Sequence, residues 1–403
     1  MSEYMTIEGG VTAPCGFRAA GVCAGIKVDA LDLALVVSDS PANVAGLFTT
    51  NAVSAAPVAV CKSVLKSGMA SAVVINSGCA NACTGAAGLA AAEKMTAETA
   101  SALGIDVGDV FVCSTGTIGK QLPLDKICAA LPEVVESLSA DGGDIAAKAI
   151  MTTDTVSKQY AVELEVGGRT VRIGGMAKGV GMIDPDMATM LAFITTDAAV
   201  ARPALQDCLK NAVDKSFNRI TVDGDQSTND TVLMFANGAS DGEVLDGNHP
   251  DWPLFCSAVE DVTLTLAKKM IEDGEGATKF VTITVKGAVT TYDANLAAKA
   301  IANSMLCKTA WFGGDPNWGR VIAAVGYSKA EVDPEKIDID FGAIAAVVNG
   351  RMVESVTFEE LEKVFKQKAF EIEVNLNLGS ASETVYTCDC SYEYVKINAE
   401  YMT

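Results

Sequence analysis

Apolar residues recur along this chain in short runs, and the spacing of these runs predicts β-strands. Residues 370–376 alternate strictly between apolar and polar, which is typical of a half-buried antiparallel strand. Other runs are apolar throughout, as expected for strands buried on both faces. Gly167-Gly168 separates two runs and predicts a hairpin. The predicted strands are Leu33–Val37, Ser71–Ile75, Val110–Cys113, Gln159–Val166, Thr170–Ile173, Leu191–Thr195, Thr231–Phe235, Lys279–Val285, Lys336–Asp340 and Phe370–Leu376.

Helices are expected in the segments between these runs, where Ala, Glu and Lys are frequent. They are Gly88–Leu103, Gly143–Met151, Pro203–Lys215, Pro253–Ile271, Ala294–Leu306 and Thr357–Phe365. Strands and helices are mixed but do not alternate strictly. The fold class predicted is therefore α+β, a layered α/β sandwich with largely antiparallel sheets. No repeat or linker marks an internal domain boundary.

Composition limits the possible partners. The 403 residues are 49% hydrophobic, enough for one large domain or two ordinary ones. A formal net charge of −21 argues against nucleic acid or an anionic membrane as a partner. No apolar run of about 18 residues and no signal-peptide pattern is present, so a cytoplasmic protein is expected.

The cysteines and the single histidine narrow the possible chemistry. The twelve cysteines lie mostly among apolar residues and are expected to be reduced and buried. The close pairs Cys79/Cys83 and Cys388/Cys390 lack zinc-site spacing, and we expect neither a metal nor a cofactor. His249 lies in a polar loop beside Gly and Pro. An acyl-transfer enzyme with this sequence would need a carboxylate, a Lys or an α-amine as its base.

The segment from Lys178 to Leu191 contains the most informative bond, between Ala188 and Thr189. Glycines, a Pro-centred turn and a small residue precede a Thr that leads into an apolar strand. Cleavage before Thr189 would give it a free α-amine, whose pKa of roughly 7.7–8 suits a base at neutral pH. Nucleophile and base would then share one residue. An ordinary loop feeding a buried strand is the alternative.

Other polar segments could complete a site. Ser114-Thr-Gly-Thr-Ile-Gly119 follows a predicted strand and offers hydroxyl and backbone N–H donors suited to an oxyanion hole, although a plain turn is the alternative. The Asp-, Asn- and Ser-rich segment 216–230 fails the EF-hand pattern and suggests a polar network under a site. Glu272, Asp273 and Glu275 at a helix end suggest a bound cation, or a solvated acidic end.

Together these segments resemble the ornithine acetyltransferase family, also called glutamate N-acetyltransferase. The longest shared motif is Lys-Gly-x-Gly-Met-Ile-x-Pro-x-Met-Ala-Thr-Met-Leu at 178–191, and Cys79 departs from the family in replacing a usually polar residue. The resemblance runs through Asn76–Gly85, Ser114–Gly119, Lys178–Leu191, Ser216–Asp230, Glu272–Thr278, Lys308–Arg320 and Asn398–Thr403.

The resemblance implies self-cleavage at Ala188-Thr189 into an α chain, 1–188, and a β chain, 189–403, which form one catalytic unit and an α2β2 assembly. The family resembles N-terminal-nucleophile enzymes in mechanism, with a topology of its own. Thr189 would take the acetyl group of N²-acetylornithine and pass it to glutamate, while Thr115 and Gly116 form the oxyanion hole. Whether acetyl-CoA is a second donor stays open. The implied substrate-binding residues are Thr152, Lys178, Thr189, Glu275, Asn398 and Thr403.

Two other functions remain as alternatives. A self-processing amidase or aminopeptidase of related fold would use the same Thr but release the acyl group to water. A non-catalytic acidic binding protein would stay a single chain, unchanged by Thr189→Ala.

Overall fold

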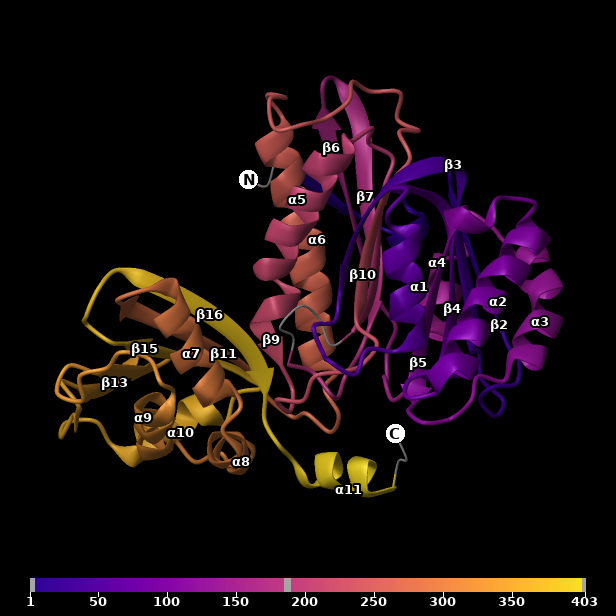
Figure 1. The fold of residues 1–403 in the computed structure, drawn as a ribbon. Helices are drawn as coiled ribbons and strands as arrows, with labels where there is room; N and C mark the ends of the chain where they lie inside the picture. The colour runs from indigo at the N-terminus through magenta and orange to yellow at the C-terminus, as the bar shows by residue number, and fades with distance from the viewer. Residues whose placement is uncertain (1–3, 185–189, 401–403) are drawn as a thin grey trace.

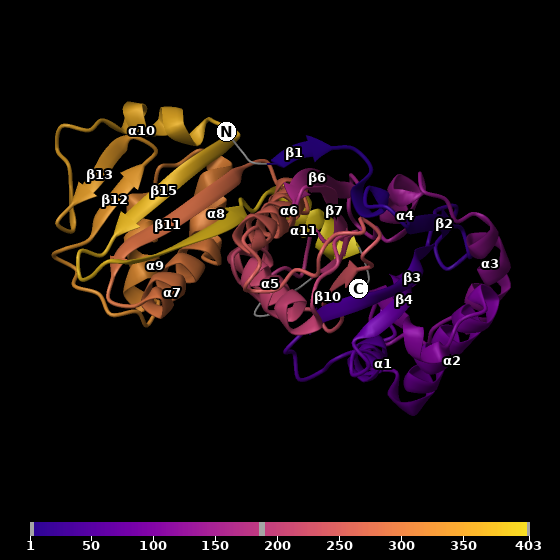
Figure 2. The ribbon, with the colours of Figure 1, turned by 90° about the horizontal axis from the view of Figure 1, so that it is seen from above.

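The chain folds into two lobes, each built on its own β-sheet (Figure 1). The computed structural model describes residues 4–184 and 190–400. Within them, the large lobe has a nine-stranded sheet and the small lobe a seven-stranded sheet. Seen from above, the small lobe lies on the side where α5 (Arg202–Asp214) and α6 (Trp252–Glu272) cover the large lobe (Figure 2).

The large sheet bends along β3 (Leu33–Phe48), so that its two halves face each other. Its pairing is antiparallel except between β8 and β10 and between β4 and β5. In sheet order the strands are β1 (Tyr4–Ile7), β6 (Lys158–Val166), β7 (Arg169–Lys178), β8 (Leu191–Thr196), β10 (Thr231–Ala236), β3, β4 (Met69–Cys79) and β5 (Val110–Thr117), with β2 (Phe17–Val22) along β3.

Three large apolar cores fill the layers of the large lobe. One lies between the sheet and helices α5 and α6. The second lies between the two halves of the sheet, where Phe193 of β8 and Phe111 of β5 are both fully buried. The third is covered by helices on the opposite outer face. The remaining helices of this lobe are α1 (Ala56–Val64), α2 (Gly85–Leu103), α3 (Leu124–Glu136) and α4 (Gly143–Ala149), with 3-10 turns at Gly10–Thr12, Val107–Asp109 and Phe217–Arg219.

The small lobe has one core of its own, around Trp311, Phe341 and Phe365. Its strand order is β14 (Arg351–Met352), β13 (Ile344–Val348), β12 (Asp338–Phe341), β15 (Ala369–Asn375), β11 (Phe280–Ala288), β16 (Ala381–Cys388) and β9 (Ile220–Thr221). Its helices are α7 (Thr291–Ala302), α8 (Met305–Gly313), α9 (Trp318–Tyr327) and α10 (Phe358–Phe365).

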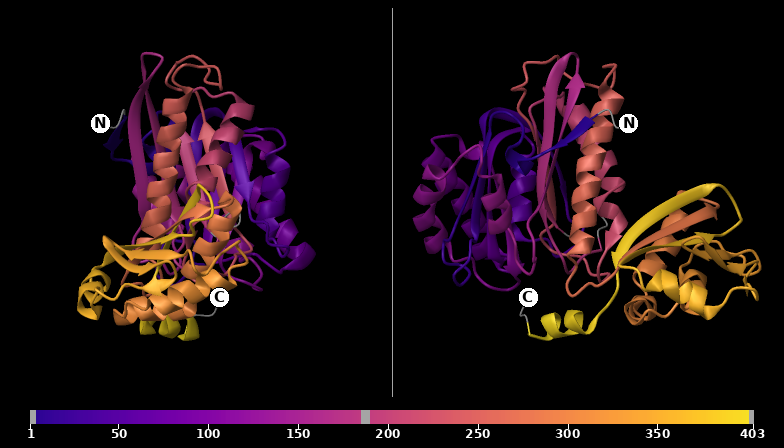
Figure 3. Two further views of the ribbon diagram at one scale, coloured as in Figure 1. Left: turned by 90° about the vertical axis from the view of Figure 1, so that its left-hand side faces the viewer. Right: turned by 180° about the vertical axis from the view of Figure 1, so that it is seen from behind.

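Two of the connections between the lobes are made by β9 and by the chain after β16. The short strand β9 follows α5 of the large lobe in sequence and pairs with β16 of the small sheet. After β16 the chain turns back, and α11 (Tyr392–Glu400) extends from the small lobe beneath the large one (Figure 3). The C-terminal helix is thereby brought to the end of the large sheet.

The predicted fold class is confirmed, because mixed strands and helices form layered, mostly antiparallel sheets. Each predicted strand overlaps an observed one, and Gly167-Gly168 forms the predicted hairpin with both φ angles positive. The prediction of one helix over 294–306 is wrong at its C-terminal end. Asn303 and Ser304 interrupt it, and the Ser304 side chain caps a new helix, α8.

The prediction of buried cysteines holds only for part of the set. All twelve are free thiols, and six are buried. Cys15, Cys23 and Cys83 are exposed, so the prediction is wrong for them. A cysteine in a loop between elements can be exposed even when its neighbours in sequence are apolar.

Two further features concern ligands and membranes. Among residues 4–184 and 190–400, no group of three His, Cys, Asp or Glu side chains is placed to hold a metal ion. No helix in the described part of the chain has the length and apolar character needed to cross a bilayer.

Candidate active site

A cavity of about 250 Å³ opens at one end of the large sheet. The ends of β5 and β7 and the start of β8 border it, together with residues 223–230 and α11. Every predicted site residue within the described chain lines it, and these are Thr115, Gly116, Thr152, Lys178, Glu275 and Asn398. Ala188, Thr189 and Thr403 lie outside the described residues. Met190, the residue bonded to Thr189, lines the cavity.

Thr115 and Gly116 form the end of β5 rather than a loop after it. Gly116 has φ +128°, a conformation that residues with a side chain rarely adopt. A Cβ there would lie 2.4 Å from the carbonyl carbon of Gly78 on neighbouring β4. Only glycine therefore lets the two strands approach this closely, which brings the backbone of residues 115–116 to the cavity wall.

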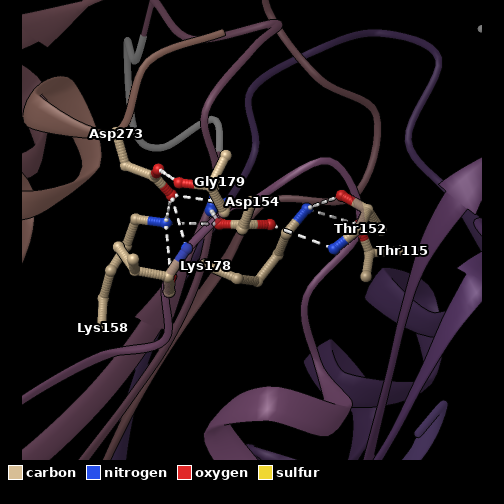
Figure 4. Close-up of polar contacts among 9 residues, drawn as sticks. Thr115, Thr152, Asp154, Lys158, Lys178, Gly179 and Asp273 are labelled. Carbon is tan, nitrogen blue, oxygen red and sulfur yellow. Dashed lines mark hydrogen bonds and ion pairs between the residues drawn. The ribbon is translucent and has the colours of Figure 1, made fainter. Parts of the chain in front are cut away.

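Lys178, the last residue of β7, lies beside two hydroxyl groups (Figure 4). Its Nζ donates to Oγ1 of Thr152 at 2.9 Å and to Oγ1 of Thr115 at 3.1 Å. An ammonium group has donors and no acceptor, so both hydroxyl oxygens accept. Their own hydrogens are free to point toward a ligand oxygen. The arrangement supplies a cation and two oriented O–H donors at one end of the cavity.

A buried ionic network lies behind Lys178 (Figure 4). Asp154 accepts from Lys158 Nζ at 2.7 Å, from Gly179 N at 2.8 Å and from Thr152 N at 3.0 Å. Burial opposes its ionisation, but Lys178 and Lys158 outweigh burial and lower the pKa of Asp154 to about 2. Burial also lowers the pKa of Lys178, and Asp154 opposes that change. Asp154 thus holds the positions of both Thr152 and Gly179, the residue after Lys178.

Asp273 belongs to this network and not to a cation site. Its Oδ2 accepts from Lys158 Nζ at 2.6 Å and from Thr155 N at 3.0 Å. The prediction that Glu272, Asp273 and Glu275 together bind a cation is therefore wrong for Asp273, whose charge is already paired. Glu272 is exposed and outside the cavity lining, whereas Glu275 faces the cavity.

A second part of the cavity wall, the acidic end, is formed by loops and α11. Glu275 Oε2 accepts from Asn398 Nδ2 at 2.7 Å. Tyr394, also on α11, donates its hydroxyl to Asp223 at 3.2 Å. Ser391 donates to the carbonyl of Gly276 at 2.6 Å. None of the α11 side chains is fully buried, but Tyr392 packs edge-on against Phe312 of α8 and Tyr394 packs against the core beneath α5 and α6. Polar and aromatic contacts together hold this helix over the cavity.

The loop before β10 contributes residues that the sequence analysis did not identify singly. Asn229 Nδ2 donates to the carbonyls of Ala80, 2.6 Å away, and Ser114, 2.8 Å away. Asp223 accepts from the amides of Met182 and Ile183. Segment 216–230 thus forms the polar network that its composition suggested. The contact partners lie far away in sequence, so no local pattern could identify them.

His249 has no part in this cavity. Its ring lies beside the hairpin turn at Gly167, and its Nδ1 accepts from the amide of Asp251. The residues lining the described cavity include Lys, Asp and Glu but no His. These surroundings agree with the absence of an imidazole base from the predicted chemistry.

Half-buried hydroxyl groups and a buried ammonium group at strand ends, together with an acidic wall, define a site suited to chemistry at a carbonyl group of a cationic substrate. A family model matches residues 18–403 with the description ArgJ family. The chain belongs to the ArgJ family.

Three comparisons illustrate this relationship. The arginine biosynthesis bifunctional protein ArgJ of Symbiobacterium thermophilum is 48% identical over 402 residues, with 98% of this chain and 99% of that protein covered. A crystal structure of the protein of that name from Bacillus halodurans has 43% identity and a TM-score of 0.51, covering 53% of this chain and all of that chain. The ornithine acetyltransferase of Mycobacterium tuberculosis, solved with ornithine, has 48% identity and a TM-score of 0.43, covering 46% of this chain and all of that chain.

Proposed function

We propose that this protein is an acetyltransferase of arginine biosynthesis that moves the acetyl group of N²-acetylornithine to glutamate. The observation that carries the proposal is the cavity itself. It is lined by Lys178 with its two hydroxyl partners, by Glu275 and by Met190. Relatives named as arginine biosynthesis proteins over nearly the full length support the same activity.

Thr189 is the proposed nucleophile, freed when the bond after Ala188 is broken. Residues 189–403 are 215 of the 403 residues, or 53%. The whole of the solved Bacillus chain is matched, but it covers only 53% of this chain. A separate β chain would cover the same share. We propose that the α chain, 1–188, and the β chain, 189–403, stay together and assemble as α2β2 in the cytoplasm.

The reaction proceeds in two halves. The α-amine of Thr189 takes the hydroxyl proton while the oxygen attacks the acetyl carbonyl carbon. Thr115 and the Gly116 amide hold the resulting oxyanion. The amide C–N bond then breaks, the amine returns the proton to the leaving nitrogen, and ornithine departs. Glutamate's α-amine then attacks the acetyl-Thr189 ester and loses a proton to the α-amine of Thr189. The ester C–O bond breaks, the Thr189 oxygen recovers that proton, and N-acetylglutamate leaves.

Substrate recognition follows from the charges at the two ends. Two donors of the Lys178 ammonium bind Thr115 and Thr152, which leaves one for a substrate carboxylate. Glu275 would bind the side-chain ammonium of ornithine. Asn398 would hold the Glu275 carboxylate in place through its hydrogen bond. Thr403 would add a hydrogen bond. Since relatives are called bifunctional, we include acetyl-CoA as a second donor to glutamate.

Thr189→Ala tests this proposal. The variant is expected to remain one chain by mass spectrometry and to transfer no acetyl group, whereas wild type gives two fragments and N-acetylglutamate. Thr309→Ala, at an exposed hydroxyl on α8, is the matched control and should behave as wild type. Fully active wild type of full length would contradict the mechanism. Acetate release without glutamate, at the rate of transfer, would indicate an amidase instead.

A further inference from the structure

The loop before β10 holds a buried carboxyl group that the reaction above does not use. Asp230 is 2% exposed and lines the cavity. Its Oδ2 atom is buried and has no hydrogen-bond partner in the described part of the chain. A buried carboxylate oxygen without a partner is costly, because it loses hydration and gains nothing in return. The cavity therefore presents an acceptor that a ligand or a chain end could use.

The neighbours of Asp230 indicate which group that is. The backbone amide of Met190 and the hydroxyl of Ser227 hydrogen-bond its carboxyl group. The next residue, Thr231, donates its amide to the Met190 carbonyl at 3.0 Å. Asp230 is thus fixed beside the residue that follows Thr189. Bond lengths alone keep the α-nitrogen of residue 189 within about 3.6 Å of the Met190 nitrogen.

We propose that Oδ2 of Asp230 accepts a hydrogen bond from the α-amine that cleavage creates at Thr189. Asp230 is then the positioning residue of a triad, in which the Thr189 hydroxyl is the nucleophile and the α-amine is the base. This inference rests on the proposed function. It follows the general rule that a base is itself oriented by a third group.

The charge of the site is consistent with this role. Burial raises the pKa of the Asp230 carboxyl well above its usual range, and Lys178 opposes that rise only in part. An ammonium against Oδ2 would favour the ionised carboxylate. The amine becomes an ammonium each time it takes the Thr189 proton, so the carboxylate stabilises the charge formed in that step.

Asp230→Asn tests the inference, because it keeps the shape and removes the charge. We expect it to cleave itself into two fragments but to form the acetyl-enzyme about 100-fold more slowly. The amine pKa seen in the pH dependence of this step should fall by about one unit, since the neighbouring negative charge is gone. Asp207→Asn, at an exposed position on α5, removes the same charge and should change neither property.

Rapid mixing with N²-acetylornithine alone, followed by mass measurement of the β chain, isolates the first half-reaction. Slowing only in the second half-reaction, with glutamate present, would show that Asp230 binds the acceptor's α-amine and would overturn the Thr189 assignment. An Asp230→Asn protein with the wild-type rate and pH dependence overturns the inference. Inactive wild type would contradict the proposed function instead.

Thermal unfolding would show whether the Asp230→Asn variant folds. If it does not, Asp230→Glu provides the test instead. Glu retains the charge on a longer arm. It should keep the wild-type pH dependence of acetyl-enzyme formation even where the rate falls. A Glu variant whose amine pKa falls by about one unit would also overturn the inference.

Discussion

The two ends of the cavity are built in opposite ways. Thr115, Thr152 and Lys178 form a hydroxyl end on strand termini, supported by buried ion pairs, and Lys178 is only 9% exposed. Glu275, Tyr394 and Asn398 form an acidic end on a loop and on a helix with no buried residues. A preorganised, dry environment strengthens electrostatic stabilisation of a transition state. The exposed end instead suits recognition and release of substrate.

Asp154→Ala should have the largest effect, because it breaks the support of the hydroxyl end. Loss of Asp154 leaves Lys158 with one ion-pair partner and removes the hydrogen bonds to Thr152 and Gly179. Removing one partner of a buried ion pair costs about 3–5 kcal/mol. Urea unfolding should show a loss of that size, together with loss of acetyl transfer.

Asp144→Ala is the matched control, because Asp144 and Lys148 form an ion pair at the same i,i+4 spacing on the surface. It should change the free energy of unfolding by about 1 kcal/mol or less.

Acid titration gives a second check of the role of Asp154. The Asp154 pKa of about 2 lies below its unfolded value, so its stabilisation is complete above pH ~4 and is lost as pH falls toward 2. Asp154→Ala should lack this loss; equal acid profiles would contradict the network.

Gly116→Ala tests whether backbone geometry matters at the same end. The added Cβ meets the β4 backbone at 2.4 Å, so residues 115–116 must shift. Displacement of one oxyanion donor typically costs about 2.7–4 kcal/mol, or 10²–10³-fold in kcat. Steady-state kinetics should show this loss in kcat with little change in KM. Gly326→Ala, on α9 with open space around it, should be neutral.

Glu275→Gln moves the test to the acidic end. A hydrogen bond to a charged group is worth about 1.5–3 kcal/mol, so KM for N²-acetylornithine should rise about 10- to 150-fold with kcat nearly unchanged. Glu272→Gln, an exposed neighbour outside the cavity lining, is the control. A fall in kcat without a change in KM would mean that the two ends do not divide their roles as described.

Tyr394→Phe should have the smallest effect. It removes one hydrogen bond, from the Tyr394 hydroxyl to Asp223, while α11 keeps its contacts at Ser391 and Asn398. The expected cost is about 1 kcal/mol, or about fivefold in KM. Tyr292→Phe, on a side chain that is 71% exposed, should leave KM unchanged. A loss as large as that of Glu275→Gln would show that α11 depends on this single contact.

Local patterns predicted the strands well, because alternation and apolar runs depend on neighbours in sequence. The motif at 178–191 and the Ser-Thr-Gly at 114–116 identified one end of the cavity for the same reason. Asp273 was misjudged because its partner, Lys158, lies 115 residues away. Asn229 and Asp230 were recognised only as part of a polar segment. Their roles depend on Ala80, Ser114 and Met190, which only the folded sheet brings near.

The order of strands β7, β8, β10 and β3 has a consequence for the cut protein. Strands β8 and β10 follow residue 189 but lie between β7 and β3, which precede it. Two full hydrogen-bond ladders therefore join the proposed fragments, and their apolar side chains share cores on both faces. Neither piece could leave on dilution or be exchanged between molecules without melting the sheet. Cleavage would create a new N-terminus, but the two fragments would still unfold together in one thermal transition.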